Sequence, residues 1–235
     1  MMNERKESTI AVLGAMDEEV RLLGQHLQNK QYIHEAGLDI LMGEIDTSQS
    51  HLHVVATVAG MGMVAAGAAT QFLITRFHPE SILFSGIAGN ISNKVDVNDV
   101  VLGGTLRYLD SDMDLIGQAY PEEKEYHSDA SLIRIAEDVL REQQVNYIIG
   151  IIATGNRFID TAEKREQARK QTSADIVEME GAAVIHIADK NSVPALVLRA
   201  VSDNTDTEYE SFHHFDISEY ADTASQIIIN ILKKL

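Results

Sequence analysis

Short apolar runs alternate with segments of helical periodicity along almost the whole chain, and this alternation restricts the possible folds most strongly. The runs 10–13 and 81–84 are apolar at nearly every position, as is typical of buried strands, whereas 130–143 has the apolar face of an amphipathic helix. Such alternation predicts an α/β protein with a mixed, mostly parallel sheet and helices on both faces. The predicted strands are 10–13, 40–45, 52–58, 81–84, 100–108, 147–153 and 194–201, and the predicted helices are 17–27, 63–77, 130–143, 162–170, 181–189 and 217–235.

The composition indicates one soluble domain. The 235 residues contain no Pro/Ser-rich linker, so we expect a polar tail at 1–8 followed by a single domain at 9–235. No apolar run is long enough to span a bilayer, the N-terminal residues lack the apolar core of a signal peptide, and there is no cysteine. We therefore expect a cytoplasmic protein with no membrane partner.

Charge and histidine content argue against two kinds of ligand. The formal net charge is −17 and the basic residues are scattered, so nucleic acid is not an expected partner. His51 and His53 would face one side of a strand, and His213 and His214 are adjacent. Neither pair has a third ligand at a spacing along the chain that marks a metal site, so none is predicted.

Glycine-containing turns follow several predicted strands. These segments are 60–62, 86–89 and 155–158, and Ser202 and Asp203 end a further strand. In open α/β sheets, ligands bind beyond the carboxyl ends of the strands, and glycine lets the backbone approach a ligand closely. The glycines do not fit a dinucleotide-binding or phosphate-binding loop, so nucleotide phosphates are not expected ligands.

Acidic side chains stand among apolar or small residues in three distant parts of the chain. Glu178 and Glu180 lie in one such segment, Glu19 follows the first strand, and Asp203 ends the last strand. Burying an unpaired carboxylate costs several kcal/mol, which favours a shared polar pocket over a purely structural role. Simpler alternatives are a solvated helix-dipole partner for Glu19, a structural salt bridge for Glu178 and a cap or turn role for Asp203.

Together these segments resemble the 5′-methylthioadenosine/S-adenosylhomocysteine nucleosidases, a family of the nucleoside phosphorylase superfamily. The resemblance covers about 10–232, and its motifs are specific in their order and spacing. It implies a single three-layer α/β/α domain with a central twisted mixed β-sheet, a homodimer, no cofactor and a small nucleoside substrate. The segments that carry it are 14–20 (GAMDEEV), 59–62 (AGMG), 85–89 (SGIAG), 158–159 (FI), 177–183 (VEMEGAA) and 199–203 (RAVSD).

The resemblance also implies an activity, which is hydrolysis of the bond between adenine and a 5′-thio-substituted ribose. Glu19 would activate water, while Asp203, oriented by Ser202, would protonate N7 of the departing adenine. This division of work between two carboxyl groups is similar to that of glycoside hydrolysis.

Further residues are expected to bind the nucleoside. Glu180 and the Met179 backbone would hold the ribose hydroxyls, and Phe158 would stack on the purine, whose edge would bond to the backbone of Ile159. The remaining expected contacts are with Met16, Met61, Glu178 and Phe215.

Four residues depart from the pattern of that family: Ile87, Asn90, Leu109 and Asn156. They leave the rate and the preferred 5′ substituent open. One alternative function is that of a phosphorylase, which would need a site for the phosphate anion. Phe84 and Ile87 stand where phosphate-using relatives tend to have Arg and Ser, and this argues against such a site. The other is a nucleoside-binding sensor without catalysis.

Overall fold

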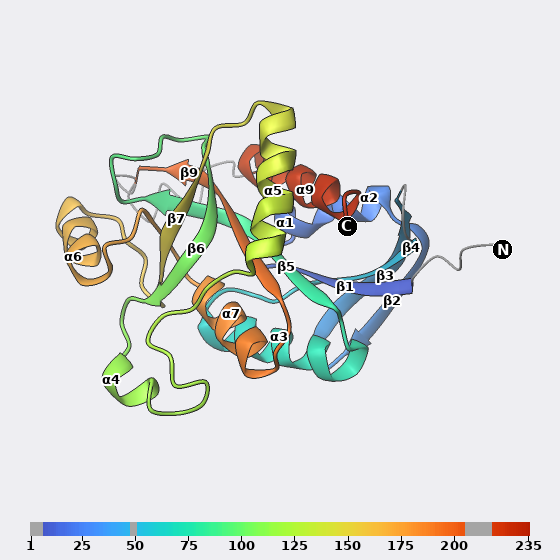
Figure 1. Cartoon of the computed structure of the whole chain (residues 1–235), viewed down its shortest axis with the longest axis horizontal. Coiled ribbons are helices and arrows are strands. Elements are labelled where there is room, and N and C mark those ends of the chain that lie inside the picture. The colour runs from blue at the N-terminus through green and yellow to red at the C-terminus, as the bar shows by residue number, and fades with distance from the viewer. Residues whose placement is uncertain (1–6, 48–50, 205–217) are drawn as a thin grey trace.

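The computed structural model describes residues 7–47, 51–204 and 218–235, and nine strands within these residues form one mixed sheet (Figure 1). The strand order is β2-β3-β4-β1-β5-β8-β7-β6-β9, and β9 also pairs with β5. The second half of the sheet therefore curls into a closed ring of strands. The strands are β1 (Glu7–Gly14), β2 (Gln28–Glu35), β3 (Leu38–Asp46), β4 (His51–Val58), β5 (Ser81–Asn90), β6 (Val100–Tyr108), β7 (Tyr147–Thr154), β8 (Ile176–Glu178) and β9 (Ala195–Asp203).

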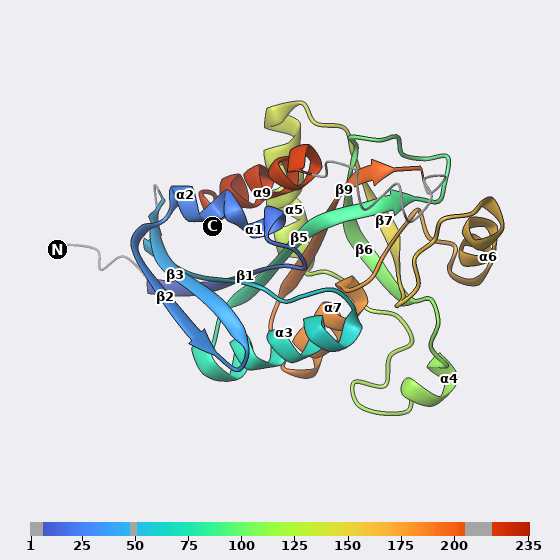
Figure 2. The same cartoon turned by 180° about the vertical axis from the view of Figure 1, so that it is seen from behind.

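Helices cover both faces of this sheet. Figures 1 and 2 show α1, α2, α5 and α9 on one side and α3 and α7 on the other. The helices are α1 (Glu18–Arg21), α2 (Leu23–His26), α3 (Met63–Phe77), α4 (Met113–Ile116), α5 (Ala130–Gln143), α6 (Ala162–Thr172), α7 (Gly181–Lys190) and α9 (Ser218–Leu232).

Alternate residues of the central strands belong to different apolar clusters. In β1, Ile10 and Val12 pack on the side of α5 and α9, while Ala11 and Leu13 pack on the side of α3 and α7. Side chains of a strand point alternately to its two faces, so a strand covered on both faces must be apolar at every position. The three-layer α/β/α arrangement with a mixed sheet that the sequence predicts is confirmed.

Some elements differ from the predicted ones. The helix expected at 17–27 consists of α1 and α2, and the chain turns extended at Leu27. β2 was not predicted, because its residues are mostly exposed and polar and pair only with β3 at the sheet edge. β5 continues through 86–89, so these glycines lie within a strand instead of after it. β1 begins at Glu7, inside the predicted tail.

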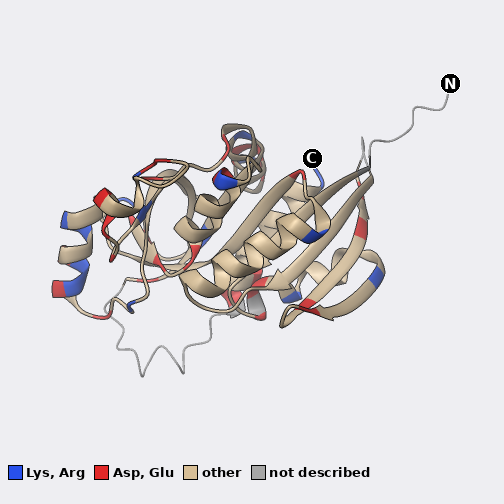
Figure 3. Cartoon of the chain, turned by 90° about the horizontal axis from the view of Figure 1, so that it is seen from below, with Lys and Arg blue, Asp and Glu red and all other residues tan. Residues whose placement is uncertain are grey.

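The distribution of charge and hydrophobicity adds three observations. Figure 3 shows Lys and Arg spread over several elements, with a group of them on α6 at the left, and Asp and Glu interspersed among them. α3 carries one charged residue, Arg76, near its end. No helix within the described ranges is long and apolar enough to cross a membrane.

Candidate active site

Glu19 is held in a fixed orientation at the end of β1. Its side chain is 3% exposed, so it is not the solvated helix-dipole partner that the sequence left open. One carboxylate oxygen, Oε2, accepts hydrogen bonds from the backbone N–H groups of Ala15 (2.5 Å) and Met16 (3.0 Å). The other, Oε1, accepts from the N–H of Ile87 at 3.2 Å. Burial raises the pKa of Glu19, while the Arg199 charge and these three donors oppose the rise.

Gly86 permits two charged groups to lie against β5. A Cβ atom at this position would lie 2.7 Å from Glu19 Oε1 and 2.8 Å from Arg199 Nη1. Both distances are shorter than real Cβ contacts, so any other residue here would displace the Glu19 carboxylate or the Arg199 guanidinium. The absence of a Cβ at Gly86 lets the Glu19 carboxylate and the Arg199 guanidinium approach the same point of the strand.

Arg199 forms a buried ion pair with Glu178. Its Nη2 and Nε atoms donate to Glu178 Oε2 at 2.6 and 3.2 Å, and its guanidinium carbon lies 4.1 Å from the centre of the Phe84 ring. The two charged side chains are 1% and 3% exposed. The structural salt bridge that the sequence left open for Glu178 is therefore present.

Glu178 also organises the start of α7. Its Oε2 atom accepts from the backbone N–H groups of Glu180 (3.1 Å) and Gly181 (2.7 Å), and its Oε1 atom accepts from the Thr154 hydroxyl. The Thr154 oxygen in turn accepts from the N–H of Ala182. Because the first N–H groups of a helix lack partners within it, these contacts fix where α7 begins and hence where Glu180 points.

Glu180 stands at the start of α7 and is 6% exposed. Its Oε1 atom accepts from the N–H of Gly62 at 2.7 Å, and its Oε2 atom lies 4.0 Å from Arg199 Nη2. Burial, followed by the nearby Glu178 charge, raises the pKa of Glu180 to about 7, although Arg199 opposes the rise. The Glu19 charge contributes in the same direction as Glu178, which places the two site carboxylates in one electrostatic environment.

The turn before α3 is held from two sides. Gly60 and Gly62 have φ angles of 84° and 91°, which favour glycine. Glu180 accepts from the N–H of Gly62, and Asn156 Oδ1 accepts from the N–H of Met63 at 3.1 Å. Asn156 therefore has a structural role that an aspartate could also perform, and its departure from the family pattern leaves this contact in place.

Asp203 ends β9 beside Gly89 of β5. The Ser202 hydroxyl lies 3.0 Å from Asp203 Oδ2 and 3.3 Å from the carbonyl oxygen of Ala88. Gly89 is two residues beyond Ile87, whose N–H binds Glu19, a separation of about 7 Å along a strand. The structure thus places Glu19 and Asp203 beside neighbouring residues of β5, with Glu180 adjoining through Arg199.

Phe158 and Ile159, which are predicted to bind the purine, line a cavity of about 710 Å³ beside α6, and Glu19, Glu180 and Asp203 are not among its lining residues. Phe158 is half-buried and Ile159 is buried, and Leu109 belongs to the same lining. The loop that carries Phe158 begins at Gly155, whose N–H donates to the carbonyl of Glu178 at 3.0 Å. This contact ties the cavity to the segment that positions Glu180.

The other residues that are predicted to contact the nucleoside differ in how far they are exposed to solvent. Met16 and Met179 are half-buried, and the Met16 N–H binds Glu19. Met61 is 68% exposed, on the glycine turn before α3. Phe215 lies outside the residues that the structure describes. The assignment of these residues to substrate binding stays a prediction.

Sequence reasoning assigned no role to Arg199 and Thr154. Arg199 interrupts the apolar strand 195–201, and a charged residue at a position buried on both faces was the signal that could have identified it. Thr154 gave no comparable signal, because a hydroxyl at a strand end is common on protein surfaces.

The structure gives a direct prediction for the stability of this centre. Arg199→Met leaves the Glu178 carboxylate buried without its cation, so the free energy of unfolding should fall by about 3–5 kcal/mol. Urea denaturation followed by circular dichroism measures this. Arg76→Met, which breaks the exposed Arg76–Glu35 pair, is the control and should cost no more than about 1 kcal/mol. Equal, small effects of both substitutions would contradict the importance of the buried pair.

The layered fold and the buried carboxylates beside β5 define an α/β protein whose site suits acid–base chemistry. A family model described as Phosphorylase superfamily matches residues 9–233. The chain belongs to that superfamily.

Individual related proteins show which members of the superfamily the chain is similar to. The 5′-methylthioadenosine/S-adenosylhomocysteine nucleosidase of Staphylococcus epidermidis is 32% identical over 86% of this chain and 91% of its own. The S-adenosylhomocysteine nucleosidase from Streptococcus pyogenes, solved with 5-methylthiotubericidin, has a TM-score of 0.89 at 28% identity and covers 99% of both chains. The native futalosine hydrolase of Helicobacter pylori has a TM-score of 0.86 at 29% identity, over 97% of this chain and 98% of its own. These findings confirm the resemblance seen in the sequence.

Proposed function

We propose that this protein hydrolyses the N-glycosidic bond of 5′-methylthioadenosine and S-adenosylhomocysteine, releasing adenine and a 5-thio-substituted ribose. The observation that carries the proposal is the position of buried Glu19 and of Asp203 beside β5, with buried Glu180 4.0 Å from Arg199. The proposal is further supported by the nucleosidases to which the chain is similar over most of its length.

Glu19 is proposed to take the proton from the attacking water. A carboxylate with a raised pKa is a stronger base than an ordinary glutamate, and burial gives Glu19 this property. Three backbone donors fix its orientation, so little reorganisation is needed when water binds. Its negative charge also stabilises the positive charge that develops on the ribose as the base leaves.

Asp203 is proposed to protonate N7 of the departing adenine. The Ser202 hydroxyl at 3.0 Å supports an orientation of the carboxyl group toward the base. Phe158 would stack on the purine, and the Ile159 backbone would bond to its edge. Both residues line the cavity of about 710 Å³ beside α6, which has room for a purine.

Glu180 is proposed to accept hydrogen bonds from the ribose hydroxyls. The Gly62 N–H fixes Oε1, and the ion pair between Arg199 and Glu178 fixes the backbone from which Glu180 projects. Glu178 would thus support binding through position and not by direct contact. Met16, Met61, Met179 and Phe215 complete the proposed lining around the ribose and the 5′-thio group.

Water is favoured over phosphate as the nucleophile. A phosphate site needs cations with free donors, whereas the Arg199 guanidinium is 1% exposed and donates to Glu178 and to the Leu198 carbonyl. Phe84 is fully buried beneath that guanidinium, and the Ile87 N–H is bonded to Glu19. The carboxylates nearby would repel a phosphate.

The test is release of free base in phosphate-free buffer, with 5′-methylthioadenosine, S-adenosylhomocysteine, 5′-deoxyadenosine and futalosine as substrates. We expect adenine and the free thio-sugar from the first two, identified by mass spectrometry. Strict dependence on phosphate, with a sugar 1-phosphate as product, would show a phosphorylase. Tight binding without release would show a sensor. Preferred cleavage of futalosine would instead indicate a substrate preference like that of the Helicobacter pylori futalosine hydrolase.

We also propose a homodimer that buries part of α3. Val64 on this helix is 84% exposed and Met61 just before it is 68% exposed, and the helix carries one charge. Such an apolar face favours contact with a second copy. Light scattering after gel filtration should give twice the chain mass of 25.9 kDa. Val64→Glu should shift the mass toward the monomer, and a monomeric parent protein would refute this proposal.

A further inference from the structure

Glu44, His51 and His53 form a cluster at the opposite end of the strands from the candidate active site. His51 and His53 are two residues apart on β4 and therefore share one face. β3 runs antiparallel to β4, with Glu44 opposite His53 and Asp46 opposite His51. The third ligand that the sequence spacing does not show is thus supplied by the neighbouring strand. Five residues separate His53 from Val58 at the carboxyl end of β4, about 17 Å.

The distances within the cluster suit a shared ion. His51 Nε2 lies 3.6 Å from Glu44 Oε2, and His53 Nδ1 lies 3.8 Å from Glu44 Oε1. Both exceed the length of a good hydrogen bond. With metal–ligand bonds of about 2.0–2.1 Å, neighbouring ligands of a tetrahedral zinc ion are roughly 3.4 Å apart. One ligand atom from each residue lies within 4.8 Å of the others, so a small contraction would complete the geometry.

Asp46 and Asn29 orient two of the three ligands. His51 Nδ1 lies 2.9 Å from Asp46 Oδ1, and in the neutral tautomer whose Nδ1–H donates to Asp46, Nε2 can coordinate an ion in the cluster. A metal ion would take the place of the Nε2 proton through which a protonated His51 pairs with Glu44. Asn29 Nδ2 donates to Glu44 Oε2 at 2.5 Å. Carboxylates and amides that hold metal ligands in this way are typical of zinc sites.

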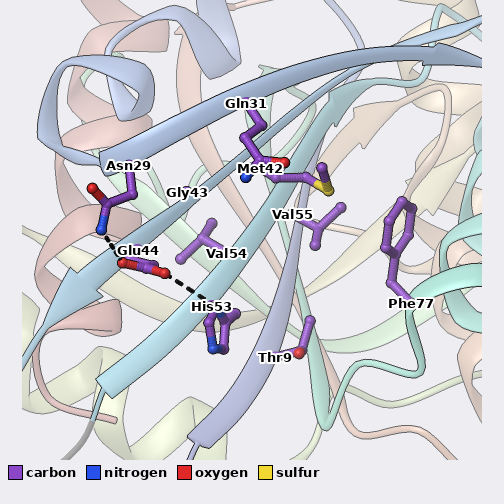
Figure 4. A pocket seen from close by; sticks show the side chains of 10 residues that line it. All are labelled: Thr9, Asn29, Gln31, Met42, Gly43, Glu44, His53, Val54, Val55 and Phe77. Carbon is purple, nitrogen blue, oxygen red and sulfur yellow. Dashed lines mark hydrogen bonds and ion pairs between the residues drawn. The ribbon is translucent and has the colours of Figure 1, made fainter.

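The cluster is open to ions and water. The side chains of Glu44, His51 and His53 are 26%, 27% and 41% exposed. Glu44 and His53 line a cavity of about 320 Å³, shown in Figure 4 with Asn29 bonded to Glu44. The cavity provides room for water as a further ligand, and the net charge of −17 favours cations.

We propose that Glu44, His51 and His53 bind a divalent transition-metal ion of the zinc type, with water from the cavity as the remaining ligand. Two imidazoles and one carboxylate are a ligand set that such ions accept. The ion would join β3 to β4 near the edge of the sheet, away from the carboxylates around β5. It would therefore act on stability and not on the proposed hydrolysis.

The test is a titration of the tag-free protein with Co²⁺, followed by visible absorption, and with Zn²⁺ as a competitor. We expect one Co²⁺ per chain, displaced by Zn²⁺. His53→Asn and Glu44→Gln should weaken binding at least about 100-fold, and Asp46→Asn about 10- to 100-fold. His34→Asn is the matched control, because His34 on β2 also pairs with an aspartate, Asp39 at 2.8 Å, but belongs to no candidate metal cluster among the residues that the structure describes. It should bind as the parent does.

A thermal measurement separates this site from binding elsewhere. Zn²⁺ should raise the Tm of the parent and of His34→Asn in a concentration-dependent way, because an ion that binds the folded state stabilises it. His53→Asn should show no such rise. Absence of saturable binding by the parent, or unchanged affinity in both His53→Asn and Glu44→Gln, would overturn the proposal.

Discussion

Asp203→Asn should lower kcat for adenine release by about 10²- to 10⁴-fold, the range that general acid catalysis typically contributes. Asparagine has nearly the same shape and can accept the hydrogen bond that Ser202 gives to Asp203. It cannot donate a carboxyl proton to N7. Binding of the nucleoside should therefore be nearly unchanged, so that KM or the dissociation constant from calorimetry shifts little while kcat collapses.

The control for this substitution is Asp39→Asn, on the exposed hairpin of β2 and β3. The Asp39 side chain is 95% exposed, so its loss of charge should leave kcat unchanged. A variant at position 203 that keeps most of the parent activity would show that the proton reaches adenine from another group.

Glu19→Gln should reduce hydrolysis by a similar factor, because an amide cannot take the proton from water. Its effect on structure should be local. Three backbone N–H groups point at this carboxylate, so the NH₂ group of glutamine would face at least one donor, a loss of about 1–3 kcal/mol. Steady-state adenine release measures the rate, and thermal unfolding shows that the fold persists. Glu35→Gln, at a partly exposed ion pair, should behave as the parent.

One substrate distinguishes these two roles. A nucleoside whose base leaves readily without protonation bypasses the need for an acid but still needs an activated water. It should restore much of the rate of Asp203→Asn and little of the rate of Glu19→Gln. Rescue of both variants to the same extent would contradict the separate assignments.

The fold was predictable because most of its elements bury apolar side chains in regular patterns. The bounds of α3, β6 and α5 agree with the predicted ones, since each has clear periodicity and a clear beginning and end. β2 and β8 were missed for different reasons. β2 is an exposed edge strand, and β8 has only three residues, too few for any pattern.

The acidic residues of the site could be predicted from the sequence, but the ion pairs and hydrogen bonds that hold them could not. Glu180 stood out because carboxylates are rare among apolar residues, and the structure buries it. That Arg199 neutralises Glu178 depends on how β8 and β9, which are separated by α7, lie in the sheet, and no spacing along the chain shows this. Glu44 beside His53 is a second such case, because it depends on strand register.

The most direct measurement is a crystal structure of Asp203→Asn with 5′-methylthioadenosine, which the slow variant should hold intact. We predict that the purine stacks on Phe158 with N7 within hydrogen-bond distance of the side chain at position 203. The ribose hydroxyls should contact Glu180, and Glu19 should face a water near C1′. A nucleoside bound in the cavity beside Glu44, or bound out of reach of Glu19 and Glu180, would contradict the convergence of these three acidic residues on one glycosidic bond.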